Sequence, residues 1–221
     1  MATSGSYDFN LTRNQIATQA LRKVGAIAQG QTPNNDQLNE AFESLNVIIK
    51  NLQAHGIGLW KRRLTEYTAA QEIEPESDVI WIEKAYIRRN DEDTPLRLHG
   101  MEDYFDIVSK DDEGLSTDLY FDRSISDPMI TLWPVPDSST DTLYCYEYAK
   151  LEDFDSASDD PDAPPAWLRM LIFGLAYDLS FDYGLPPTER VMLRTEAAAS
   201  MKELKGMDKD IETEKIIRSI Y

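Results

Sequence analysis

LNEAFESLNVIIKNL, residues 38–52, places apolar side chains three and four residues apart. That spacing puts them on one face of a helix, where they form a continuous stripe. The stripe consists of Leu38, Ala41, Phe42, Leu45, Ile48, Ile49 and Leu52. A face this apolar has to be buried against another element, so the stretch predicts a packed helical core. Thr32 followed by Pro33, or alternatively Asn34 or Asn35, would cap this helix, and Gly56 and Gly58 would end it.

Three further segments have helical patterns. In the first, Thr12 is a candidate N-cap and Gln15, three residues later, completes a capping box before an apolar run that ends near Gly25. Residues 167–183 form a strongly apolar helix, and residues 186–204 form a last long one. We expect the stripe of residues 38–52 to meet Leu168, Leu171, Leu175 and Leu179 of the third helix.

Between these helices the periodicity changes. Residues 64–68, 78–89, 95–98, 118–121, 129–133 and 142–148 are typical of short strands separated by turns. Pro134 and Pro136 are expected to end one strand, because proline cannot donate to a ladder. Residues 101–109 suggest a short helix with Tyr104 and Phe105 on its inner side.

The expected fold class is therefore α+β: a helical bundle from the N- and C-terminal helices, with a small antiparallel β domain inserted between them. The expected boundaries are residues 1–59 for the N-terminal helices, 60–151 for the β domain, 152–206 for the C-terminal helices and 207–221 for an extended tail.

The chain of 221 residues holds 40 acidic and 22 basic residues, for a formal charge of −18. This charge argues against a protein that clamps nucleic acid, because such affinity comes mainly from Lys and Arg on phosphates. No apolar run is long enough to span a membrane. The single cysteine, Cys145, is expected to be a small buried core residue, which fits a reducing cytoplasm.

The residues of common catalytic and metal sites are scarce. There are two histidines, His55 and His99, and neither lies in a nucleophile motif. In the acidic connector, Asp153 and Asp155 match the start of an EF-hand loop, but Ser158 and Pro164 replace its Gly and bidentate Glu, which favours a solvated loop. We therefore predict no catalytic, cofactor-binding or metal-binding residues. The acidic run at residues 111–113 leaves a carboxylate-based hydrolase as an alternative.

Two segments are candidates for contacts with other molecules. Lys61, Arg62 and Arg63 form a basic cluster that would contact DNA, or would balance acidic neighbours or a partner subunit; the second interpretation is favoured. The tail is charged but carries apolar side chains, which predicts that it becomes buried on a partner. Those side chains belong to Ile211, Ile216, Ile217, Ile220 and Tyr221.

Three stretches together resemble the head-to-tail adaptor proteins of short-tailed bacteriophages, the group of packaged-DNA-stabilisation proteins and tail-tube gatekeepers. The first covers residues 12–25 with Gly30-Gln31-Thr32-Pro33 and residues 45–60. The second is ITLWPVP, residues 130–136, with the aromatic strand after it. The third is PPAWL, residues 164–168, leading into residues 176–179 and 183–184. They span nearly the whole chain in family order, although no single stretch is a chemical signature.

This resemblance implies a structural virion protein rather than an enzyme. It implies a homo-oligomeric ring, usually of twelve copies, made in the host cytoplasm and located in the virion neck. Such a ring docks under the portal protein, retains packaged double-stranded DNA, which passes through its channel without sequence-specific binding, and forms the platform for tail or nozzle proteins. The resemblance also implies that C-terminal tails reach the portal. The alternatives are a virion-associated cell-wall hydrolase and a small DNA-binding regulator, and the net charge counts against the regulator.

Overall fold

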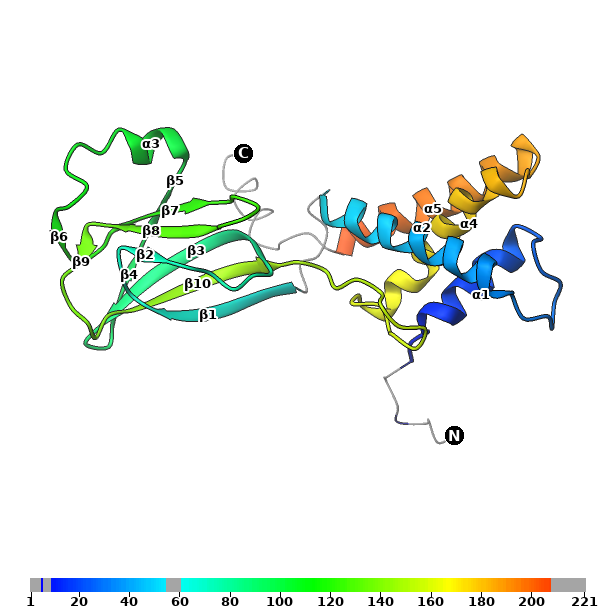
Figure 1. Ribbon diagram of the computed structural model, residues 1–221, viewed down its shortest axis with the longest axis horizontal. Coiled ribbons are helices and arrows are strands. Elements are labelled where there is room, and N and C mark those ends of the chain that lie inside the picture. The colour runs from blue at the N-terminus through cyan, green and yellow to red at the C-terminus, as the bar shows by residue number, and fades with distance from the viewer. Residues whose placement is uncertain (1–4, 6–8, 55–60, 208–221) are drawn as a thin grey trace, which may run out of the picture. The chain divides into compact units, whose positions relative to one another are not determined.

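The computed structural model describes residue 5, residues 9–54 and residues 61–207, and it shows an α+β protein (Figure 1). The chain divides into two compact units: a helical unit from residues 1–60 and 151–221, and a β unit from residues 61–150. The helical unit is thus assembled from both ends of the chain.

The helical unit contains α1 (Arg13–Lys23), α2 (Asn35–Ala54), α4 (Leu168–Asp182) and α5 (Pro187–Met207). Helix α4 contacts each of the other three helices, and a short 3₁₀ turn, Pro165–Trp167, leads into it. Leu45 of α2 and Leu175 of α4 are fully buried in one shared core. The stripe of α2 and the apolar face of α4 therefore belong to the same hydrophobic cluster.

Local hydrogen bonds explain where the first two helices begin. Thr12 accepts from the backbone N–H of Gln15 while Gln15 accepts from that of Thr12, so the predicted capping box is confirmed. At α2, Asn34 and Gln37 exchange the same pair of bonds, at 2.8 and 3.0 Å. Of the two caps considered for this helix, the structure shows the one at Asn34.

The acidic connector exposes most of its acidic side chains, as expected, and also contacts the first two helices. Asn46 of α2 makes two hydrogen bonds to the backbone of Phe154, whose side chain is buried in the helical core. The backbone N–H of Arg13 donates to the carbonyl of Asp159 over 2.8 Å, and Lys50 forms a 2.7 Å ion pair with Asp153. These contacts tie the connector to α1 and α2.

The β unit carries two four-stranded sheets and one short pair of strands. The first sheet has the order β1-β10-β3-β4, the second β2-β8-β7-β5, and β6 pairs with β9. Their bounds are β1 Arg62–Thr68, β2 Glu72–Ile73, β3 Val79–Arg89, β4 Glu92–Pro95, β5 Arg97–His99, β6 Glu113–Gly114, β7 Asp118–Asp122, β8 Met129–Trp133, β9 Val135–Pro136 and β10 Thr142–Ala149. A short helix, α3 (Met101–Phe105), follows β5.

Not every pair of strands in this unit is antiparallel. Strand β5 runs parallel to β7, and β6 runs parallel to β9, so the expectation of an antiparallel domain does not hold for these two pairs. The remaining ladders are antiparallel, and β8 ends at Trp133, directly before Pro134, as expected. The parallel pairs arise because long connections, including α3, return the chain in the same direction.

Alternation along the strands gives each sheet an inner and an outer face. In β10 the side chains of Leu143, Cys145, Glu147 and Ala149 are buried, and the tyrosines between them are partly exposed. In β7, Leu119 and Phe121 pack into the core of the unit while Tyr120 lies on the other side. The core of the β unit thus lies on one side of each sheet, and the other side of each sheet faces away from this core.

Candidate functional site

The basic cluster predicted from the sequence lies at the start of β1, and its arginines contact acidic side chains of the β unit. Arg63 makes a two-pronged contact with Asp78, at 2.6 and 2.7 Å, and the hydrogen bond from Arg63 holds the pKa of Asp78 below its ordinary value. Arg62 donates to the hydroxyl of Tyr148 and lies 3.2 Å from a carboxylate oxygen of Glu83. These contacts fit the interpretation that the cluster balances acidic neighbours.

A buried carboxylate sits beside this cluster. Glu147 on β10 is fully buried and accepts hydrogen bonds from the hydroxyls of Thr65 and Tyr67 on β1, at 2.8 and 2.6 Å. The guanidinium of Arg63 approaches the same carboxylate to 3.5 Å. Burial, together with the bond to Glu147, raises the pKa of Tyr67. This network joins the edge strand β1 to its neighbour β10.

The outer face of the first sheet is aromatic. We call Tyr86, Tyr144, Tyr146 and Tyr148 the tyrosine face, because all four are partly exposed and register pairs Tyr86 with Tyr144 across β3 and β10. Those two rings stack 4.9 Å apart and nearly parallel. The guanidinium of Arg88 lies 4.9 Å from the Tyr144 ring centre, and that of Arg62 lies 4.8 Å from the Tyr148 ring centre.

His99 has a partner that sequence reasoning missed. Its Nε2 lies 2.6 Å from Oδ1 of Asp118, which is almost wholly buried and also receives hydrogen bonds from Thr117 and Arg97. Burial opposes ionisation of Asp118, but the three donors outweigh it and hold its pKa below the ordinary value. The parallel pairing of β5 with β7 creates this contact, and no sequence motif predicts it.

A cavity of about 250 Å³ borders His99 and is also lined by Trp81 and Arg123. It belongs to the β unit, and its walls are mostly apolar side chains. The histidine is held in place by Asp118, yet its contacts also serve to join β5 to β7. The contact with Asp118 therefore gives His99 a structural role, and that role does not depend on His99 taking part in a reaction.

The segment after β5 carries three exposed apolar side chains. We call Met101, Phe105 and Val108 the α3 patch; they are 63%, 62% and 98% exposed. Tyr104 packs inward, stacking 4.9 Å from the Tyr120 ring, as expected from the sequence. The expectation for Phe105 is wrong, because a helix of this length turns neighbouring positions to different sides.

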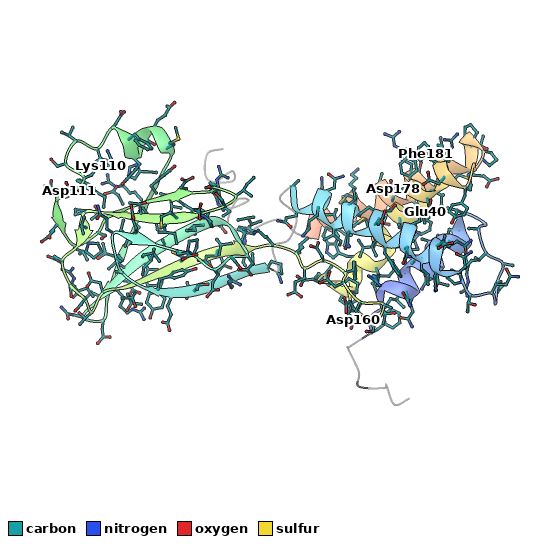
Figure 2. All side chains as sticks on the ribbon, in the orientation of Figure 1. Glu40, Lys110, Asp111, Asp160, Asp178 and Phe181 are labelled. Carbon is teal, nitrogen blue, oxygen red and sulfur yellow. The ribbon has the colours of Figure 1, made fainter. Side chains whose placement is uncertain are left out.

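The acidic run considered for a hydrolase follows this patch. Asp111, Asp112 and Glu113 are exposed, and Figure 2 marks Asp111 beside Lys110. Within residues 9–54 and 61–207, no three His, Cys, Asp or Glu side chains gather as metal ligands. The helices in the same part of the chain are too short or too polar to cross a membrane.

Some of the sequence predictions fall on residues outside the described ranges. They are the tail residues Ile211, Ile216, Ile217, Ile220 and Tyr221, and also His55. Cys145, by contrast, is described and is buried, and burial raises the pKa of its thiol. The cysteine is therefore a core residue with low nucleophilicity.

Comparison of the chain with models of known protein families finds none that matches, and comparison with curated proteins finds no significant match.

Proposed function

We propose that this protein is the subunit of a head-to-tail adaptor ring in the neck of a tailed bacteriophage. The observation that carries the proposal is the position of the three stretches that resemble this family. Thr12 caps α1, the stretch around Pro134 and Pro136 ends β8 and leads into β9, and Pro164 and Trp167 begin α4. The three stretches that resemble the family therefore contain residues at which helices and strands of this protein begin or end.

The architecture supports the same proposal. A bundle formed by helices from both ends of the chain would provide the ring body, and the inserted β unit would form a separate module. The charge of −18 suits a channel that DNA passes through, since a negative wall repels phosphates. In this role the protein docks beneath the portal, usually as twelve copies, retains the packaged DNA and carries the tail or nozzle proteins.

The tail provides the test of portal docking. Removing residues 208–221 leaves α5 whole, so we expect an unchanged circular dichroism spectrum and loss of co-sedimentation with the portal ring. A full-length variant with Ile211, Ile216, Ile217, Ile220 and Tyr221 all replaced by serine is expected to behave like the truncation. The matched control changes the polar tail residues Thr213 and Ser219 to alanine and should dock normally. Normal docking of the truncated protein would refute the portal proposal.

The hydrolase alternative has its own test. A cell-wall hydrolase would cleave peptidoglycan, and replacement of Asp111, Asp112 and Glu113 by their amides would abolish that cleavage. In the adaptor proposal the unmodified protein releases no fragments from peptidoglycan.

A further inference from the structure

The tyrosine face and the α3 patch lie on opposite sides of the β unit. In β10 the tyrosines alternate with core residues, so the tyrosine face is the outer side of the first sheet. In β7, Tyr120 alternates with Leu119, which is buried in the core, and Tyr104 of α3 stacks on Tyr120. Helix α3 therefore packs on the outer side of the second sheet, next to β5 and β7, and Figure 1 shows it beyond β7 and β8, on the side away from β3 and β10.

The two surfaces also differ in charge. Residues 101–113, which carry the α3 patch, contain six acidic residues and one lysine. Lys110 is held close by, donating to the carbonyls of Phe105 and Ile107. The α3 patch is thus a set of exposed apolar side chains in a strongly acidic surrounding.

The tyrosine face differs from the rest of the β unit in its balance of basic and acidic side chains. Residues 61–150 contain 10 basic and 21 acidic residues, but the strands under this face place Arg62, Lys84 and Arg88 among the tyrosines. Glu66, Glu83 and Asp93 lie next to them, so basic and acidic side chains are equal in number here. On a protein of charge −18, this is a surface that an acidic partner approaches with little repulsion.

The arrangement of the tyrosine side chains favours a protein partner over a sugar or a nucleic-acid base that would stack on them. Tyr86 and Tyr144 cover one another, and guanidinium groups lie against Tyr144 and Tyr148, so these rings present mainly edges and hydroxyls. Sugars and bases bind to open ring faces. Tyrosine and arginine are the side chains enriched at the centres of protein interfaces, and Leu64, 56% exposed, adds apolar surface among them.

We propose that the α3 patch of one copy packs against the tyrosine face of the next copy. The contact joins apolar side chains in an acidic surrounding to an aromatic surface on which basic and acidic side chains are equal in number. It joins two different surfaces on opposite sides of one unit, so each copy can bind one neighbour on each side. Head-to-tail contacts of this kind generate a closed ring where the rotation between successive copies closes, and an open filament where it does not. The inference rests on the proposed ring, and it assigns the β unit a part in holding the ring together.

Cysteine cross-linking tests this contact. Val108→Cys protein is mixed with Tyr146→Cys protein at about 1 mM in about 0.15 M salt, where charges are screened beyond ~8 Å, and treated with a short bis-maleimide. We expect a covalent mixed dimer at least several-fold above the yield from Ile125→Cys mixed with Tyr146→Cys. Ile125 is the matched control because it is a fully exposed apolar residue of the same unit outside both surfaces. Native protein corrects for any reaction of buried Cys145.

Two further variants make the outcome decisive. Leu64→Cys offers a second attachment point on the tyrosine face, since Leu64 pairs with Tyr146 in register, and it should give the same result if Tyr146→Cys disturbs the fold. Adding Phe105→Ser to the Val108→Cys protein should lower the yield to that of the control. Yields equal to the control throughout would overturn the proposal, and so would efficient dimers of Val108→Cys with itself, which require a symmetric contact.

The result is independent of portal docking. Docking without the cross-link would keep the adaptor proposal and remove this contact from it. The cross-link without docking would establish the contact and count against the adaptor.

Discussion

At the scale of single residues, Glu147 is a buried carboxylate whose hydrogen bonds join strands β1 and β10 of the β unit. Glu147→Ala would leave the partly buried hydroxyls of Thr65 and Tyr67 without their acceptor, so we expect a loss of about 2–5 kcal/mol in the free energy of unfolding. Glu147→Gln keeps the shape and should cost less. Urea denaturation measures both, with Glu92→Ala, an exposed change on β4, as the control. An alanine variant as stable as the control would mean that the network contributes nothing.

Asp178 on α4, marked in Figure 2, has the opposite effect on stability. Burial, and next the charge of Asp182, raise its pKa. The folded state thus holds this proton more tightly than the unfolded chain, and ionised Asp178 destabilises the fold above the ordinary carboxyl pKa. The penalty disappears as the pH falls to that value, about 4.

We therefore expect Asp178→Asn to raise the melting temperature at pH 7, with the difference from the unmodified protein shrinking as the pH is lowered towards 4. Asp160→Asn, an exposed change in the connector that Figure 2 also marks, is the control and should show no such trend. A constant difference at all pH values would show that the effect is not electrostatic.

At the scale of elements, α2 and α4 contribute to the same core of the helical unit. Leu45 and Leu175 are both fully buried, so replacing either by alanine should cost about 2–5 kcal/mol. Val47 lies on the same helix as Leu45 but is 67% exposed, and Val47→Ala should change stability by less than about 0.5 kcal/mol. Thermal or urea unfolding of the full chain measures all three. If both leucine variants were as stable as Val47→Ala, the α2–α4 core would be wrong.

At the scale of the whole molecule, charge is expected to delay assembly. A net charge of −18 opposes contact between free copies, so we predict a monomer at micromolar concentration until the protein meets the portal. Size-exclusion chromatography with light scattering measures this directly. A stable ring formed without the portal at that concentration would contradict the prediction. In the adaptor proposal, the weak contact proposed for the β unit would act only where a portal brings copies together, because a high local concentration favours it.

The features that the sequence alone determined are those that depend on near neighbours in the chain. The stripe of α2 and the capping box at Thr12 involve residues three or four positions apart, and helix geometry converts that spacing directly into contact. The proline after β8 works in the same local way. The change from helical to strand periodicity also separated the helical segments from the β segment.

Tertiary structure alone decided the features that join distant residues. Glu147 meets Thr65 across 82 positions of sequence, and His99 meets Asp118 because β5 and β7 happen to run parallel. Spacing carries no record of which strands become neighbours, since many pairings satisfy the same alternation. The side of the unit on which Phe105 points was undetermined for a related reason: a helix of five residues is too short for its pattern to define a buried face. The two surfaces proposed to meet between copies became visible only once the strands were paired, because pairing is what gathers the tyrosines onto one face.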